Sequence, residues 1–138
     1  MRACENRNFL SPLRYPGGKR RLVGAVADVL ERIGRVPDIL VEPFAGGAFV
    51  ALACLEAGAA REIALGDADP LVGAFWSVVF SDRADRLAED VRRAEFSVGE
   101  WRRVREMEPG DEVEAAFKCL YLNRTCFSGV LHAGPIGG

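Results

Sequence analysis

Apolar and polar positions alternate with a helical period early in the chain and then give way to short, continuously apolar runs. Apolar residues at helical spacing predict a helix over residues 22–33, and Gly34 and Pro37 are typical of its end. The run from Ile39 to Val41 predicts a continuous apolar strand, and Pro43 holds Glu42 extended at its carboxyl end. A second strand is predicted over residues 62–67.

Helices fill the intervals between and after these strands. An alanine-rich helix is predicted over residues 48–56, closed by Gly58. Because such a helix bridges the two strands, they should be parallel. Further helices are expected after Pro70, from an N-cap at Asp82 through Phe96, and from an N-cap at Asp111 through about Leu122. A third strand is conceivable over residues 96–98.

These elements define an α/β fold, a partial Rossmann-like parallel sheet flanked by helices. A doubly wound sheet usually has about five or more strands, so we expect the sheet to be incomplete and the chain to form part of a domain. With 138 residues, 49% of them hydrophobic and 28% charged, the chain has the composition of a single globular domain.

Charge and cysteine content narrow the function classes. The net charge of −2 argues against a uniformly basic protein, although a local nucleic-acid face remains open where arginines are dense in residues 83–105. The four cysteines have no Cys-x-x-Cys spacing and His132 is the single histidine, so neither a metal site nor a redox pair is expected. Without a signal peptide or an apolar run of spanning length, we expect a cytoplasmic protein with no membrane partner.

The first chemical signal is the interval between a glycine loop and an acid. Asp67 follows Gly46 at close to the spacing of about 20 residues at which a nucleotide-binding β-α-β unit places a carboxylate on the ribose hydroxyls. Glycines let backbone amides approach such a ligand. The alternative is that Gly46-Gly47 is only a turn and Asp67 only a residue that favours a turn at a strand end.

Two further stretches carry polar and aromatic groups in glycine-containing loops. Residues 15–19 combine an aromatic ring, a tight turn and a cation that could lie along a cofactor, the cation pairing with a carboxylate; the alternative is a surface loop with a solvated lysine. Residues 121–129 offer amide, guanidinium and aromatic groups suited to phosphates, base edges and splayed bases. The alternative there is a capped helix end with Phe127 as a core plug.

Taken together and in order, these stretches resemble the Dam-like DNA adenine-N6 methyltransferases, which methylate the exocyclic amine of adenine. The resemblance covers residues 9–131. The matching pieces are Leu13-Arg-Tyr-Pro-Gly-Gly-Lys19, Leu40-Val-Glu-Pro-Phe-Ala-Gly-Gly47, Gly66-Asp-Ala-Asp69 and Leu122-Asn-Arg-Thr-Cys-Phe-Ser-Gly129.

The resemblance implies a cofactor, S-adenosyl-L-methionine, and a partner, double-stranded DNA. It implies that Asp67 accepts from the ribose, that Tyr15 and Lys19 contact the cofactor and that Phe127 and Ser128 can wedge into the base stack. The cofactor set is Tyr15, Gly17, Gly18, Lys19, Glu42, Pro43, Phe44, Ala45, Gly46, Gly47, Asp67 and Ala68. The DNA set is Asn123, Arg124, Phe127, Ser128 and Gly129.

The sequence departs from the family pattern in two places. Ala48 stands where the second glycine of the family's Phe-x-Gly-x-Gly is expected, which is tolerable if its φ angle is negative. The catalytic Asp-Pro-Pro-Tyr, whose groups would hold the adenine amine and stack on the flipped base, does not occur, so no catalytic residue is assigned.

We therefore expect an N-terminal fragment that is inactive alone. Residues 1–122 would form the cofactor-binding part and residues 123–138 the start of the target-recognition region, and a complementing C-terminal fragment would carry the catalytic motif. Two alternatives remain open: a non-catalytic DNA-binding or regulatory remnant, and a fragment of an NAD-dependent oxidoreductase. The second is disfavoured because the loop lacks the three-glycine spacing of a pyrophosphate site.

Overall fold

The computed structural model describes residues 10–14 and 19–137, and these divide into two compact units. The first unit comprises residues 10–12 and 19–67, and the second comprises residues 13–14 and 68–137. The first unit contains the 3₁₀ helix η2 (Lys19–Leu22), α1 (Val23–Ile33), β1 (Ile39–Glu42), α2 (Phe49–Glu56) and β2 (Glu62–Leu65). The second contains α3 (Pro70–Val79), α4 (Ala84–Arg93), α5 (Val98–Glu106), α6 (Glu112–Thr125) and the 3₁₀ helix η3 (Phe127–Gly129).

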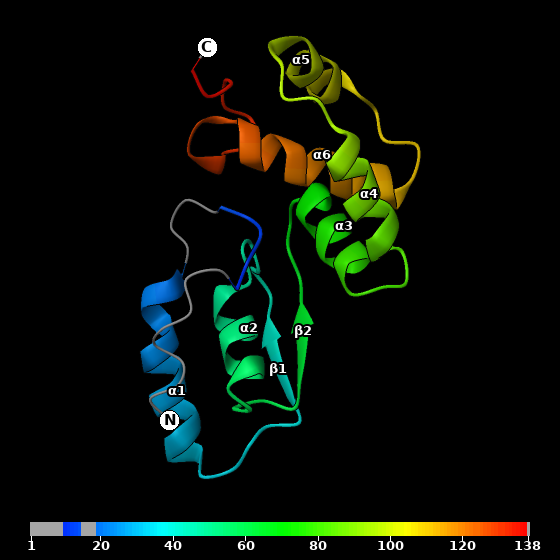
Figure 1. The fold of residues 1–138 in the computed structure, drawn as a ribbon. Coiled ribbons are helices and arrows are strands. Elements are labelled where there is room, and N and C mark those ends of the chain that lie inside the picture. Colours follow the sequence, from blue (N-terminus) through cyan, green and yellow to red (C-terminus); the bar gives the residue numbers. More distant parts are fainter. Residues whose placement is uncertain (1–9, 15–18, 138) are drawn as a thin grey trace. The chain divides into compact units, whose positions relative to one another are not determined.

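The first unit is built around a parallel strand pair. β1 and β2 run in the same direction, with Ile39 opposite Glu62 and Glu42 opposite Leu65 (Figure 1). The helix α2 packs on both strands and on α1. The expected parallel β-α-β arrangement is confirmed, as is the end of α1 at Gly34, whose φ of 71° is the left-handed conformation that favours glycine.

A small apolar cluster holds this unit together. It joins α1 to α2 and the turn after α2, and Leu40 of β1 packs against its edge. The buried members are Val23, Val50, Ala53, Cys54 and Ala59. The alternate residues of β1, Ile39 and Val41, are more than half exposed, so apolar burial is confined to one face of the strand pair.

The second unit is helical, and α6 lies at its centre. α3, α4 and α5 all pack on α6, as Figure 1 shows. Asp111 caps α6 by accepting the Glu114 N–H over 2.8 Å, as expected from the sequence. The apolar centre of the unit includes Phe75, Val78 and Val104, each at most 1% exposed.

Two expectations for this region are wrong. Asp82 does not cap α4: the N-cap position is Arg83 without a side-chain hydrogen bond, and the Arg83 N–H donates to Oγ of Ser81. Residues 96–98 form no strand, because Ser97 begins a new helix, α5, by accepting the Glu100 N–H over 3.0 Å. The Ser-x-x-Glu pattern of a capping box marks this start in the sequence.

No helix in the described part of the chain is long and apolar enough to cross a membrane.

Candidate functional site

The loop after β1 folds across the carboxyl ends of both strands. The Gly66 N–H donates to the Glu42 carbonyl over 3.0 Å, which extends the strand pairing by one bond. Returning over this edge, the Ala45 N–H donates to the Gly66 carbonyl over 2.8 Å. Backbone bonds therefore fix the loop of residues 43–48 to the edge at which open α/β sheets bind their ligands.

Asp67 is joined directly to the glycine loop. Its Oδ2 accepts the Gly46 N–H over 2.7 Å, and the side chain is half-buried. Gly46 has a φ of 49°, a conformation that a residue with a Cβ adopts at a cost. The interval that singled out these two residues in the sequence therefore corresponds to a hydrogen bond at the strand ends.

Glu42 is a buried carboxylate with two kinds of partner. It is 8% exposed, and its Oε2 accepts the Ala51 N–H over 3.0 Å. Because Ala48, the N-cap residue of α2, offers no side-chain bond, Glu42 supplies the missing cap to the first turn of that helix. Its Oε1 pairs with Nζ of Lys19 over 3.1 Å, and this ammonium also donates to the Phe44 carbonyl.

Ala48 adopts a conformation that the sequence did not indicate. An alanine in place of the family's glycine is tolerable without strain only at a negative φ. The observed φ of Ala48 is +49°, and the residue has no exposed surface. A non-glycine residue in this left-handed region costs roughly 1–2 kcal/mol. The expectation of a negative φ at Ala48 is therefore wrong. The loop keeps the backbone conformation of a glycine although residue 48 carries a methyl group.

The remaining residues of the cofactor set differ in exposure. Ala45 and Gly47 are buried in the loop, whereas Pro43 and Ala68 are exposed. Phe44 is 71% exposed, so its ring is presented to solvent at the carboxyl edge. Tyr15, Gly17 and Gly18 lie outside the described residues.

The chemistry of this edge fits a nucleoside-bearing cofactor. Asp67 places a carboxylate acceptor at the end of β2, as vicinal ribose hydroxyls require. The adjoining glycine backbone allows a ligand to approach closely, and Phe44 offers an apolar face beside it. Within the described part of the first unit, hydrogen bonds join Lys19 to Glu42 and Gly46 to Asp67, which are four residues of the expected cofactor set.

Residues 126–136 form a closed loop after α6 in the second unit. Cys126 and Pro135 form an isolated antiparallel bridge, the Phe127 N–H donates to the Gly134 carbonyl over 2.9 Å, and the Ile136 N–H donates to the Thr125 carbonyl over 2.9 Å. At its start, Phe127 is 68% exposed and Ser128 has a φ of 55°. Phe127 is therefore not a core plug, and the turn presents an aromatic ring outward.

Two side chains of α5 hold this loop in place, and neither was predicted from the sequence. The guanidinium of Arg105 donates to the carbonyls of His132 and Ala133 over 3.0 and 2.7 Å. Nε1 of Trp101 lies 3.3 Å from Sγ of Cys126. These contacts could not be predicted from the sequence, because Arg105 binds backbone carbonyl groups, which every residue carries.

Asn123 and Arg124 lie in the last turn of α6 and not in a loop. Arg124 is exposed, whereas Asn123 is 2% exposed. The Asn123 amide bonds to the backbone of Arg14 and Gly129. Of the five residues in the DNA set, Arg124, Phe127 and Ser128 are exposed, and Gly129 is buried beside Asn123.

The arginine-rich segment of residues 83–105 does not form a free basic face. Five of its seven arginines pair with carboxylates at the surface of the second unit. The ion pairs are Arg83–Glu112, Arg86–Asp111, Arg92–Glu89, Arg93–Glu89 and Arg103–Glu100. Because paired charges attract polyanions less than isolated ones, this segment gives little support to a nucleic-acid interface.

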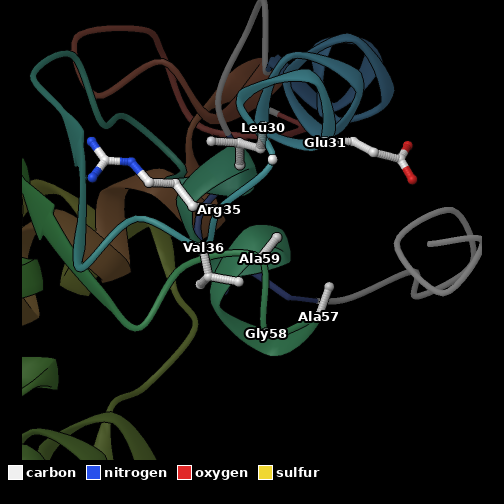
Figure 2. Close-up of a pocket in the computed structure, with 8 residues that line it drawn as sticks. Leu30, Glu31, Arg35, Val36, Ala57, Gly58 and Ala59 are labelled. Atoms are coloured by element: carbon white, nitrogen blue, oxygen red, sulfur yellow. The ribbon is translucent and has the colours of Figure 1, made fainter.

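A cavity of about 340 Å³ lies elsewhere in the first unit. It is lined by the end of α1, the turn after it and the turn after α2. Figure 2 shows Leu30, Val36 and Ala59 around it, while the charged ends of Glu31 and Arg35 point away. These turns lead into the amino ends of β1 and β2, opposite to the edge at which open parallel sheets bind their ligands.

Comparison with known families identifies the class of protein. The family model of the D12 class N6 adenine-specific DNA methyltransferase matches residues 15–138. The chain therefore belongs to the D12 class N6 adenine-specific DNA methyltransferase family, and its α/β architecture is consistent with the Rossmann-like fold of such enzymes. Among curated proteins, no significant match to the chain was found.

Proposed function

We propose that this chain provides the cofactor-binding part of a site-specific DNA adenine-N6 methyltransferase that uses S-adenosyl-L-methionine. Family membership supports the reaction class. The observation that carries the cofactor assignment is the 2.7 Å bond between the Gly46 N–H and Oδ2 of Asp67 at the carboxyl edge of β1 and β2. It brings the glycine loop and the acid of a nucleoside site together, as the chemistry requires.

Each residue has a proposed task. Asp67 accepts the ribose hydroxyls, and the residues from Phe44 to Gly47 form the wall along the cofactor. Lys19 and Glu42 hold that wall by their ion pair and by the cap on α2. When bound, S-adenosylmethionine supplies a methyl group on a positively charged sulfur. Tyr15, Gly17, Gly18, Pro43 and Ala68 complete the proposed cofactor set.

The exposed start of the loop at residues 126–136 is the proposed DNA contact. Phe127 offers a ring that can stack on a splayed base, and the Ser128 hydroxyl and the Arg124 guanidinium suit phosphates and base edges. We assign residues 1–122 to the cofactor part and residues 123–138 to the start of target recognition, with Asn123 and Gly129 supporting the loop from within.

We also propose that the chain binds cofactor weakly and does not turn over by itself. The groups that would accept the hydrogens of the adenine amine belong to an Asp-Pro-Pro-Tyr motif, and the 138 residues contain none. These groups would therefore come from outside the 138 residues. A transfer assay with tritiated cofactor and duplex DNA tests this proposal. The chain alone should transfer no tritiated methyl group to the DNA, and robust methylation of adenine by the chain alone would refute the proposal.

A thermal melt separates the proposed cofactor from its rival. S-adenosylmethionine should raise the melting temperature of the chain, because a ligand that binds the native state stabilises it, and NAD should not. A shift with NAD alone would favour an oxidoreductase fragment. DNA binding that depends on salt but is indifferent to cofactor, with no shift from S-adenosylmethionine, would favour a non-catalytic DNA-binding remnant.

A further inference from the structure

The backbone of Arg14 is held by one buried side chain. Oδ1 of Asn123 accepts the Arg14 N–H over 2.7 Å, and Nδ2 of Asn123 donates to the Arg14 carbonyl over 2.7 Å. A primary amide has an acceptor and two donors, so it can pair with both polar groups of one residue, as a neighbouring strand would. Asn123 thus fixes the main chain at Arg14, whatever side chain stands there.

The second donor of the same amide reaches the loop of residues 126–136, which we call the recognition loop. Nδ2 of Asn123 also donates to the Gly129 carbonyl over 2.9 Å, in a buried position. Because Asn123 is only 2% exposed, water cannot take the place of these hydrogen bonds if the protein partners are lost. A single side chain therefore joins Arg14 to the turn that begins with Phe127.

Gly129 contacts Arg14 by a second, independent route. Its φ is 74°, and a Cβ built on it would lie 2.4 Å from the Arg14 carbonyl oxygen and 2.9 Å from the Arg14 Cβ. Only glycine fits this approach, because any side chain would collide with backbone. We call the contacts of Asn123 and Gly129 with Arg14 the Arg14 clamp.

We infer that Asn123 is a positioning residue that couples cofactor binding to DNA binding by holding Arg14 against the turn that begins with Phe127; this rests on the proposed function. In the sequence, Arg14 immediately precedes Tyr15 of the proposed cofactor set, and Phe127 and Ser128 immediately precede Gly129. The clamp therefore fixes the residue next to a proposed cofactor contact to the turn proposed for DNA. A ligand bound at one end of the clamp then acts on the free energy of binding at the other, which makes the two binding events cooperative.

The coupling is measured as a ratio of affinities for DNA. The 138-residue chain is titrated with duplex DNA that carries a mismatched adenine, with and without saturating S-adenosylhomocysteine as the unreactive probe. In the wild type, the probe should tighten DNA binding by about 5- to 100-fold, the usual range of such couplings. Asn123→Ala and Gly129→Ala should bring the ratio close to one, while Arg14→Ala, which keeps the clamped backbone, should preserve it.

A stability-matched control separates positioning from general damage. Val78 is fully buried in α3 of the same unit, and Val78→Ala removes core packing without touching the clamp. It should keep the wild-type ratio at temperatures where all variants are folded. Loss of coupling in Val78→Ala, or full coupling in Asn123→Ala, would overturn the inference. A wild type that binds both ligands independently would overturn it alone, whereas a wild type that binds neither would refute the proposed function as well.

Discussion

The backbone N–H of Gly46 donates to Oδ2 of Asp67 over 2.7 Å, and this bond ties the loop after β1 to the end of β2. It closes the carboxyl edge of the strand pair on one side with a glycine backbone and on the other with a carboxylate. A ligand with vicinal hydroxyls and a planar base is the kind of molecule that such an edge serves in parallel α/β folds.

The first prediction concerns the charge of Asp67. Asp67→Asn keeps an oxygen that can accept the Gly46 N–H but loses the negative charge, so S-adenosylmethionine binding should weaken by about tenfold, the difference between charged and neutral hydrogen bonds. Calorimetry measures it. Asp38→Ala is the matched control, because Asp38 is an exposed acid of the same unit that pairs with Arg61 at the surface. Equal affinities of Asp67→Asn and the wild type would remove Asp67 from the site.

The second prediction ranks the two partners of the Glu42 pair. Glu42→Ala leaves the buried Ala51 N–H without its acceptor and Lys19 without its carboxylate, and should lower the free energy of unfolding by about 2–3 kcal/mol. Lys19→Met should cost less, about 1–2 kcal/mol, since the lysine side chain is 38% exposed and its ion pair is partly screened by solvent. Urea unfolding followed by circular dichroism checks the order. A larger loss for Lys19→Met would show that capping of α2 is not the main task of Glu42.

The third prediction concerns the exposed ring of Phe127. Phe127→Ala should leave stability almost unchanged and weaken DNA binding by about 5- to 100-fold, the usual loss of one stacking platform. Phe80→Ala is the comparison, because Phe80 is also exposed, at 57% against 68%, but lies at the end of α3 and not in the loop of residues 126–136. Fluorescence anisotropy with labelled duplex reads both out. If the two variants bind DNA equally well, Phe127 has no special part in recognition.

The fourth prediction concerns acid. The hydrogen bond from Arg103 lowers the pKa of Glu100 below its ordinary 4.5, and the backbone N–H of Glu114 lowers the pKa of Asp111 below its ordinary 3.8. A group whose pKa is lower in the folded state contributes stability above its unfolded value and loses it as pH falls through the folded value. The helical unit should therefore lose stability below about pH 4.

Tryptophan fluorescence follows this acid transition, because Trp76 on α3 and Trp101 on α5 both lie in the helical unit. Asp111→Asn keeps a good N-cap but cannot titrate, so its stability should fall less steeply with pH while remaining close to the wild type at neutral pH. A wild type whose fluorescence stays constant into strong acid, or an Asp111→Asn variant with the same pH slope, would contradict this account.

Local patterns predicted those elements whose causes are local. The two individual strands, the glycine end of α1 and the Asp111 cap all depend on residues a few positions apart, and each is present in the structure. Asp82 failed as a cap because the ability to cap does not decide whether the helix begins there; the chain first turns at Ser81. The helix α5 was missed although Ser97 and Glu100 marked its start.

The candidate site residues also divide into those with local causes, which the sequence predicted, and those with distant partners, which it did not. The spacing of Gly46 and Asp67 could be read from the sequence because a β-α-β unit has a nearly fixed length. The burial of Asn123 could not, since its partner Arg14 is distant in sequence and bonds through its backbone, which carries no residue signal. Nor could the sequence place Phe127, because an apolar residue in a turn fits a core plug and an exposed wedge equally well.

The central claim is that the carboxyl edge of β1 and β2 binds S-adenosylmethionine, and amide chemical shifts of the isotopically labelled chain test it most directly. On titration, the resonances of Gly46, Gly47 and Asp67 should move. Those of Gly34 and Gly58, which line the cavity near the amino ends of the strands, should stay in place. Shifts confined to Gly34 and Gly58, or no shifts at saturating cofactor, would contradict the assignment.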